Sequence, residues 1–372
     1  MKLYLIAGEA SGDTRGAEVM RSLLELAGGN GVQFYGAGGP QMRALAPAIQ
    51  DWSGEAVVGL WDVLKKYGYF RRQFYAMLAE IEALRPDAVI FIDYPGFNLR
   101  LARALRKAGT TSRLIYYISP QVWAWNRRRI PMMAKTLDLM LCIFPFEKAL
   151  YEESGLPTVF VGHPMLDSLA PKKGRVPREQ NLVGLFPGSR TKEVSRIFPV
   201  MVEAAALLHR QRPDLRFETA AASERVAALM REILQRYPEP AITIRSGGSH
   251  ELMQQAAAGM VASGTATMEA AFFEMPFTIL YRVAPLTWEV GKRLVKVPFL
   301  GMVNILAGRE LVKEFLQKDA QPPEVAREVR ALLEDAPKRE AQLEGLREVI
   351  RGLGEGGAGM RAAEAIMAAL KR

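Results

Sequence analysis

The sequence contains the run Leu182-Val183-Gly184-Leu185-Phe186-Pro187-Gly188-Ser189-Arg190, in which apolar, strand-forming residues lead into a turn of small residues. A helical pattern follows over residues 193–210. A strand, a tight turn and a helix in this order predict one unit of a parallel sheet, with the turn at the carboxyl end of the strand. Such a turn suits an anion, because the first N–H groups of the helix are free to bind it.

The same order of elements recurs along the chain, so the fold class that we predict is α/β. Strands are expected at residues 3–7, 33–36, 88–92, 114–118, 139–144 and 158–161, and again at 182–186, 216–220, 241–244, 259–262 and 277–281. Between the two sets, residues 163–181 are polar and contain several prolines, which is typical of an interdomain linker.

We therefore predict two doubly wound, Rossmann-like domains that face each other across a cleft. The first is expected at residues 1–165 and the second at residues 166–345. Residues 346–372 are expected to hold a last helix that returns to the first domain. Ligands of such domains bind outside the carboxyl ends of the strands, so the loops at those ends are the places to look for a site.

Composition limits the class of protein. The 372 residues are 49% hydrophobic and 24% charged, and no apolar run reaches the roughly 18–20 residues that a membrane span needs. The single cysteine, Cys142, excludes an internal disulfide, which fits a cytoplasmic protein. The three histidines have no ligand spacing, so we expect no metal site. The net charge of +9 suits an acidic partner, but no zinc finger, RNP-type motif or basic tail indicates nucleic acid.

The first predicted loop, residues 7–13, reads Ala-Gly-Glu-Ala-Ser-Gly-Asp. Its glycines lack the spacing of a dinucleotide-binding fingerprint. Glu9 and Asp13 would repel a pyrophosphate, so sugar hydroxyls are the better candidate ligand. The alternative, that Ser11 or Asp13 is only a helix N-cap, stays open.

Asp93 follows the predicted strand at residues 88–92. A carboxylate that protrudes from an apolar strand is positioned like a catalytic base, here one that would deprotonate an acceptor hydroxyl. The alternative is that Asp93 caps the turn that follows it. Farther along, residues 119–129 contain two tryptophans and three arginines that could stack on a sugar and bind a phosphate. Burial of the tryptophan pair and solvation of the arginines are the alternative there.

Two turns in the second domain are the candidate nucleotide site. Gly188 and Ser189 offer backbone N–H groups, and Arg190 adds a guanidinium fork that suits a diphosphate. The turn of Ser263, Gly264 and Thr265 repeats this arrangement. Glu269 follows it by about one helical turn and could accept both hydroxyls of a ribose.

Seven stretches carry a resemblance to a known family. They lie at residues 8–13 (Gly-Glu-Ala-Ser-Gly-Asp), 119–125 (Ser-Pro-Gln-Val-Trp-Ala-Trp), 144–148 (Phe-Pro-Phe-Glu-Lys), 161–163 (Val-Gly-His), 185–190 (Leu-Phe-Pro-Gly-Ser-Arg), 263–266 (Ser-Gly-Thr-Ala) and 304–312 (Asn-Ile-Leu-Ala-Gly-Arg-Glu-Leu-Val). With these motifs in order, nearly the whole chain resembles the lipid-A-disaccharide synthases. These are bacterial glycosyltransferases of the GT-B architecture.

The resemblance implies transfer from UDP-2,3-diacylglucosamine to 2,3-diacylglucosamine 1-phosphate, with inversion at the anomeric carbon and release of UDP. The UDP-sugar is a substrate, so no cofactor is expected. The implied location is the cytoplasm, peripheral on the inner face of the cytoplasmic membrane, with a homodimer as one candidate assembly. The product would serve lipid A, and so the lipopolysaccharide of a Gram-negative outer membrane.

Carried over residue by residue, the resemblance places the donor on Gly188, Ser189, Arg190, Ser263, Gly264, Thr265 and Glu269, Asn304 at the cleft, and Glu9, Ser11, Asp93 and Asn98 near the sugar. One departure matters. The family loop often reads Ile-Asp-x-Pro-Asp-Phe-Asn, and this chain has Gly96 in place of the second acid. Asp93 is therefore the candidate base, with Glu9 as its rival.

Residues 60–75 interleave apolar, aromatic and basic side chains, as membrane-interface segments do. The expected membrane or acyl-chain contacts are Trp61, Tyr67, Tyr69, Phe70, Arg71 and Arg72. The alternative is an ordinary amphipathic segment packed on the core.

Two other functions stay open on the sequence. The first is another UDP-sugar enzyme of the same architecture, a 2-epimerase or a peptidoglycan-type transferase, which would share the turns at Gly188 and Gly264. The second is a non-catalytic UDP-sugar or anionic-lipid binding protein, if Gly96 marks a loss of chemistry. Dependence of the activity on acyl chains distinguishes the implied function from the first alternative. Release of UDP on mixing the two lipid sugars distinguishes it from the second.

Overall fold

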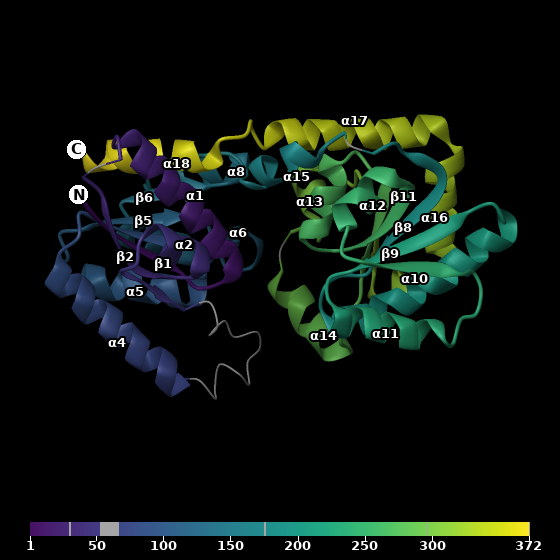
Figure 1. Cartoon of the computed structure of the whole chain (residues 1–372), viewed down its shortest axis with the longest axis horizontal. Helices are drawn as coiled ribbons and strands as arrows, with labels where there is room; N and C mark the ends of the chain where they lie inside the picture. Colours follow the sequence, from purple (N-terminus) through teal and green to yellow (C-terminus); the bar gives the residue numbers. More distant parts are fainter. Residues whose placement is uncertain (30, 53–66, 175, 296, 372) are drawn as a thin grey trace. The chain divides into compact units, whose positions relative to one another are not determined.

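The computed structural model describes residues 1–29, 31–52, 67–174, 176–295 and 297–371. The chain forms two compact units, of which unit 1 comprises Met1–Asp167 and Leu353–Arg372 and unit 2 comprises Ser168–Gly352 (Figure 1). The first boundary falls close to the one expected after residue 165. The helix α17 (Ala336–Gly352) belongs to unit 2 as a whole, although residues 346–352 were expected in the tail.

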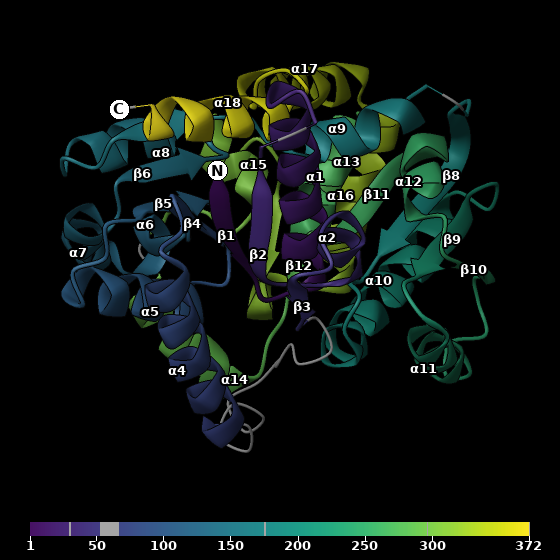
Figure 2. The ribbon, with the colours of Figure 1, turned by 60° about the vertical axis from the view of Figure 1, so that its left-hand side comes forward.

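Unit 1 contains a parallel sheet of seven strands in the order β3-β2-β1-β4-β5-β6-β7. The strands are β1 (Lys2–Ala7), β2 (Gln33–Gly38), β3 (Ile49–Asp51), β4 (Ala88–Ile92), β5 (Arg113–Tyr117), β6 (Leu139–Cys142) and β7 (Thr158–Phe160). Helices cover both faces, and the central strands are therefore apolar along their whole length. In β4, for example, all five side chains are buried. Figure 2 shows β1 and β2 side by side, with α1 (Ala10–Leu26) beside them.

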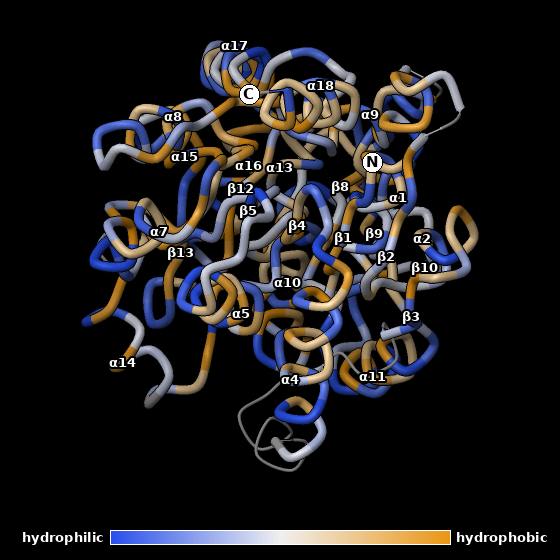
Figure 3. The backbone as a smooth tube through the Cα atoms, turned by 90° about the vertical axis from the view of Figure 1, so that its left-hand side faces the viewer, coloured by the Kyte–Doolittle hydropathy of each residue, from blue (hydrophilic) through white to orange (hydrophobic). Residues whose placement is uncertain are grey.

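The helices of unit 1 follow from amphipathic patterns that bury one stripe against the sheet. On one face lie α1 and α18 (Ala358–Leu370), and on the other α4 (Tyr67–Leu84), α5 (Pro95–Lys107) and α7 (Ile130–Thr136). Shorter helices are α2 (Pro40–Leu45), α6 (Val122–Trp125), α8 (Pro145–Glu152) and α9 (Met165–Leu169), with 3-10 turns η2 (Arg127–Arg129) and η3 (Ala170–Lys172). Figure 3 shows hydrophilic and hydrophobic residues interleaved along α4 and α5. The last helix, which was expected to return to the first domain, packs along α1.

Unit 2 repeats the plan with six parallel strands in the order β10-β9-β8-β11-β12-β13. These are β8 (Glu179–Phe186), β9 (Arg216–Ala221), β10 (Ile242–Ser246), β11 (Ala256–Ala262), β12 (Phe277–Tyr281) and β13 (Glu314–Leu316). One face carries α10 (Thr191–Gln211), α11 (Glu224–Leu234) and α16 (Pro322–Glu334), and the other carries α12 (Ser249–Gln255), α13 (Thr265–Phe272), α15 (Met302–Ala307) and α17. Unit 2 also contains α14 (Pro285–Leu294) and the 3-10 turn η4 (Gln317–Asp319).

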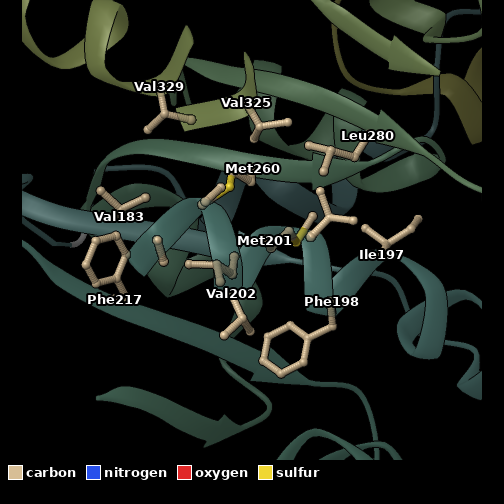
Figure 4. Packing of buried hydrophobic residues seen from close by; sticks show 14 of the residues in the cluster. Val183, Ile197, Phe198, Met201, Val202, Phe217, Met260, Leu280, Val325 and Val329 are labelled. Atoms are coloured by element: carbon tan, nitrogen blue, oxygen red, sulfur yellow. The ribbon is translucent and has the colours of Figure 1, made fainter. Parts of the chain in front are cut away.

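The core of unit 2 shows why the sequence forms these layers. In α10, apolar residues recur every three or four positions, and those on the buried stripe face β8, β11 and α16. Figure 4 shows Met201 and Val202 of α10 packed among Val183, Met260 and Val325 from those three elements. The result is a rigid sheet whose carboxyl edge presents the loops.

Candidate functional site

The strand order of each sheet decides which loops meet. In unit 1 the chain runs outward from β1 to β3 and then returns to β4 on the other side of β1, so the order reverses between β1 and β4. Ala7 and Ile92 are register partners at the carboxyl ends of these two strands. The loop with Glu9 and the loop with Asp93 therefore leave the sheet side by side, at the topological switch point where ligands of this fold class bind.

Contacts and electrostatics confirm that the two loops are close. A side chain at Gly8 would overlap the ring of Tyr94, so only glycine lets the loops pack in this way. Burial, together with the negative charge of Glu9, raises the pKa of Asp93 to about 6, while the hydrogen bond from the N–H of Tyr94 acts in the opposite direction. A carboxylate with its pKa raised toward neutrality by burial and a second acid is suited to general base catalysis.

The Asp93 turn is held in an uncommon backbone conformation. Asp93 and Tyr94 have φ values of 46° and 50°, in the left-handed region that non-glycine residues rarely adopt. Three hydrogen bonds hold the turn: Asp93 N donates to Tyr117 O (3.0 Å), and Asp93 O accepts from Asn98 Nδ2 (2.8 Å) and from Tyr116 Oη (2.5 Å). Strained turns that are fixed by their surroundings are common at functional sites.

Asn98 was expected to bind substrate, and the structure shows what it contacts. The residue is fully buried, and its Nδ2 also donates to the carbonyls of Ile6 (3.4 Å) and Ile92 (3.3 Å). It thereby ties the ends of β1 and β4 to the Asp93 turn. Its Oδ1 has no partner among the described residues. Its hydrogen bonds make Asn98 a positioning residue for Asp93.

The loop after β1 separates its acids into two roles. Glu9 and Ser11 are exposed at the start of α1, where Glu9 is the N-cap residue and makes no capping bond with its side chain. Asp13 is buried and accepts hydrogen bonds from the N–H groups of Gly39 (2.9 Å), Gln41 (3.0 Å) and Met42 (2.9 Å). Asp13 thus caps α2 from a distant part of the sequence, and Glu9 and Ser11 remain available to a ligand.

The residues after β5 surround a buried acid that the sequence did not single out. Glu147, at the start of α8, is fully buried and accepts hydrogen bonds from Ser119 Oγ (2.6 Å) and Trp123 Nε1 (2.9 Å). Burial raises its pKa to about 7, while the two donors act in the opposite direction. Trp123 is therefore a core residue, but Trp125 is 43% exposed and lies under the guanidinium of Arg129, 5.0 Å from the ring centroid.

Unit 2 contains a cavity of about 500 Å³ at its own switch point, between β8 and β11. Both predicted turns line it, because these neighbouring strands end side by side, with Val261 and Phe186 in register. Its lining includes Gly188, Ser189, Arg190, Ser263, Gly264, Thr265 and Glu269. Residues 220–222, 247 and 249, at and after the ends of β9 and β10, also line the cavity and were not predicted. Their place at the ends of predicted strands was the signal that could have found them.

The first turn of the cavity depends on glycine. Gly188 has a φ of +103°, which strains any other residue, and a side chain there would overlap the carboxylate of Glu193. Ser189 and Arg190 are exposed, and Arg190 is the N-cap residue of the long helix α10. An arginine fork beside the positive end of a 21-residue helix has the chemistry that would suit a diphosphate.

The second turn begins α13. Gly264 and Thr265 are exposed at its N-terminus, and Thr267 Oγ1 donates to Gly264 O (2.7 Å), which stabilises the first turn of the helix. Glu269, one turn in, is partly exposed and lies 3.3 Å from His250 Nε2. A carboxylate held at the rim of the cavity can accept the hydroxyls of a ribose.

Asn304 was expected at the ligand, but its hydrogen bonds are directed elsewhere. It is fully buried, and its Nδ2 donates to Val312 O (2.7 Å) and Glu314 Oε1 (2.8 Å). Its Oδ1 accepts from the N–H groups of Leu311 (2.9 Å) and Val312 (2.8 Å). These four bonds use every donor and acceptor of the amide. Asn304 thus fixes the segment before β13, and no part of its side chain is free for a substrate.

The aromatic and basic segment is only partly described, and Trp61 lies outside the described residues. At Tyr67 the structure describes only the start of α4. Tyr69 and Phe70 pack in part against the core of unit 1, where Phe70 lies 6.1 Å from the Trp52 ring. Core packing therefore accounts for much of these two rings, while Arg71 and Arg72 are exposed. No described helix is long and apolar enough to span a membrane, and no three described acids, histidines or cysteines cluster as metal ligands do.

Solved structures with this fold confirm the architecture. The chain superposes on a putative UDP-N-acetylglucosamine 2-epimerase from Listeria monocytogenes with a TM-score of 0.64 at 15% identity, covering 100% of this chain and 95% of that one. A MurG from Acinetobacter baumannii gives a TM-score of 0.56 at 13% identity, covering 99% of each chain. At these identities the likeness shows the fold, which is GT-B with two parallel-sheet α/β domains.

Proteins found by sequence comparison share much higher identity with this chain than these solved structures do. The family model described as lipid-A-disaccharide synthetase matches residues 3–367. The lipid-A-disaccharide synthase of Trichlorobacter lovleyi is 39% identical over 100% of this chain and 98% of its own length, and that of Geobacter sulfurreducens is 38% identical over 98% and 96%. The chain belongs to the lipid-A-disaccharide synthase family and is a glycosyltransferase.

Proposed function

We propose that this glycosyltransferase joins UDP-2,3-diacylglucosamine to 2,3-diacylglucosamine 1-phosphate, inverts the anomeric carbon, and releases UDP and the disaccharide 1-phosphate. The observation that carries the proposal is the cavity of unit 2, in which both glycine turns, Arg190 and Glu269 line one space at the switch point. The family match does not favour an epimerase, a peptidoglycan-type transferase or a non-catalytic binding protein.

The donor nucleotide belongs in the unit 2 cavity. A solved structure of the same fold, UDP-N-acetylglucosamine 2-epimerase from Neisseria meningitidis, is bound to UDP-N-acetylglucosamine. It superposes on this chain with a TM-score of 0.62 at 12% identity. Here the N-termini of α10 and α13 and the fork of Arg190 would bind the diphosphate, and Glu269 the ribose. The same groups would stabilise the negative charge of the departing UDP.

The acceptor belongs at the switch point of unit 1. Its 6-hydroxyl attacks the anomeric carbon of the donor sugar as the bond from that carbon to the UDP oxygen breaks. Asp93 takes the hydroxyl proton, and its raised pKa suits that step. Glu9 and Ser11, exposed on the neighbouring loop, would bind sugar hydroxyls. Gly96 supplies no acid, so Asp93 takes the role of base.

The acylated substrates imply work at a lipid surface, and we place the enzyme in the cytoplasm, peripheral on the inner face of the cytoplasmic membrane. Arg71, Arg72 and Tyr75 support this, because all three are exposed on α4 and the guanidinium of Arg71 lies 5.9 Å from the Tyr75 ring centroid. The homodimer stays a prediction, which light scattering of the purified protein tests.

Titration calorimetry with UDP tests the donor site. Arg190→Ala removes charge-assisted bonds to the diphosphate and should weaken UDP binding by about 10- to 100-fold. Arg210→Ala is the control, because it removes an exposed arginine from the far end of the same helix. Equal UDP affinity in wild type and Arg190→Ala would remove Arg190 from the donor site.

A further inference from the structure

Besides the cavity of unit 2, the structure contains a cavity of about 540 Å³ in unit 1. The proposed mechanism gives this cavity no role. Four arginines line it: Arg100 and Arg103 from α5, and Arg128 and Arg129 from the η2 turn. Its remaining lining is apolar or glycine, and it includes no carboxylate. The cavity thus combines four positive charges with an uncharged wall.

The sequence brings these arginines together through local spacing. Gly96, Arg100 and Arg103 are separated by four and three positions, so they lie on one face of α5. The η2 turn runs directly into α7, which packs against α5. Gly96 has no side chain and nothing within 4 Å of the place where one would begin, so the cavity is open at the start of the helix.

Within the described part of the chain, the four charges have no counter-ion. None of these arginines makes an ion pair with a residue that the structure describes. Arg106, one turn farther along α5, differs because its guanidinium lies 2.7 Å from the carboxylate of Asp138. The guanidinium of Arg129 stacks on the ring of Trp125, which is an uncharged partner. Four like charges around one space repel one another, and a bound anion would relieve that repulsion.

The chemistry of the lining favours a phosphate. A guanidinium fork matches the oxygens of a phosphate with two parallel hydrogen bonds, which a diffuse surface charge does not provide. The cavity begins at Pro95 and Gly96, directly after the Asp93 turn. Arg100 lies about 6 Å farther along the helix axis than Gly96, given a rise of about 1.5 Å per residue. A ligand that reaches both Asp93 and Arg100 therefore has the size of one sugar.

We propose that this arginine cavity binds the 1-phosphate of the acceptor while the 6-hydroxyl of the same sugar reaches Asp93. The phosphate on C1 and the hydroxymethyl group on C5 flank the ring oxygen of the glucosamine, and along the chain the Asp93 turn and the arginines of the cavity lie at the start of α5 and one to two turns into it. The inference rests on the proposed function and adds to it the site that distinguishes a phosphorylated acceptor from an unphosphorylated one.

The test compares two acceptors, 2,3-diacylglucosamine 1-phosphate and 2,3-diacylglucosamine, in detergent micelles. For the double variant Arg100→Ala/Arg103→Ala, the KM of the phosphorylated acceptor should rise by about 10- to 100-fold, because charge-assisted bonds are lost. The KM values of the donor and of the unphosphorylated acceptor should not change. The control is Arg21→Ala/Arg113→Ala, which removes two exposed arginines elsewhere on unit 1.

The arginine cavity could instead bind the phosphate of an anionic lipid headgroup. Sedimentation with phosphatidylglycerol vesicles, compared with phosphatidylcholine vesicles, distinguishes binding of a lipid headgroup from binding of the acceptor phosphate. If the double variant loses vesicle binding but still prefers the phosphorylated acceptor as wild type does, the assignment to the acceptor is overturned. Unchanged preference with unchanged vesicle binding overturns it as well.

A binding measurement keeps this inference separate from the proposed function. Glucosamine 1-phosphate, which is soluble, should bind the wild-type protein and the control more tightly than the double variant in calorimetry. If wild type forms no disaccharide, the proposed function fails, and this measurement still decides the cavity: equal binding by wild type and variant would refute it. Matched thermal unfolding of the variants excludes misfolding as the cause.

Discussion

Among single residues, Asp93 is the one on which the proposed chemistry depends. The carboxylate is mostly withdrawn from water and lies near Glu9, and its pKa is raised to about 6. As a general base it must be deprotonated, so the rate should be low below pH 6 and should rise as the pH passes through about 6. The acid side of the pH profile of kcat/KM measures this directly.

Asp93→Asn keeps the shape of the side chain and removes the base. We expect kcat to fall by about 100- to 10,000-fold, with little change in the melting temperature. Asp87→Asn, at the opposite end of β4, is the matched control and should keep the wild-type rate. A near-normal kcat for Asp93→Asn would mean that another group removes the proton.

Glu9→Gln distinguishes a neighbour from a rival base. Because the charge of Glu9 contributes to the raised pKa of Asp93, removing that charge should move the acid side of the profile to lower pH and leave most of kcat. Glu25→Gln, exposed near the end of the same helix, should leave the profile in place. Loss of kcat on the scale of Asp93→Asn would identify Glu9 as the base instead.

At the scale of elements, the strands and the site were predictable to different degrees. The buried runs at β4 and β12 have the bounds expected from the sequence, because continuous apolar residues mark strands covered on both faces. The edge strands β3 and β13 were missed, although β7, an edge strand of the same length, was predicted.

The turn residues were easier to predict than the buried polar residues, because a turn has a local sequence signal and a buried polar residue depends on its contacts. The turn at Gly188 is visible as small residues between a strand and a helix. Asn98 is not, because its partner carbonyl at Ile6 is 92 positions away. Asn304 has partners only seven to ten positions away, but nothing in the sequence showed that they would use its whole amide.

The loop after β5 and the helix α8 are joined through Glu147, which gives a prediction for stability. Its pKa is raised from 4.5 to about 7 in the folded protein, so between these values the folded state binds more protons than the unfolded state. The contribution of Glu147 to stability therefore falls as pH rises from 4.5 to 7. Glu147→Gln removes this dependence.

Thermal unfolding of wild type and Glu147→Gln at pH 5 and pH 8 measures the effect. The melting temperature of the variant, relative to wild type, should be higher at pH 8 than at pH 5. Glu152→Gln, exposed on the same helix, should follow wild type at both values. A difference between Glu147→Gln and wild type that does not change with pH would show that Glu147 titrates normally.

At the scale of the whole molecule, the two ends of the chain form one unit. Ile366 of α18 is fully buried, and that helix packs along α1. Ile366→Ala should destabilise unit 1 by about 2–4 kcal/mol, through lost burial and the cavity that remains. Glu364→Ala, exposed on the same helix, should change stability by less than about 0.5 kcal/mol. Denaturant unfolding measures both, and equal stabilities would show that α18 is dispensable.

The proposed reaction can be observed in one experiment. The purified protein is incubated with UDP-2,3-diacylglucosamine and 2,3-diacylglucosamine 1-phosphate, and the products are identified by mass spectrometry and by the configuration of the new glycosidic bond. We expect UDP and a tetraacylated disaccharide 1-phosphate in equal amounts, with the anomeric carbon inverted. Epimerised donor, free monosaccharide or no release of UDP would refute the proposed function.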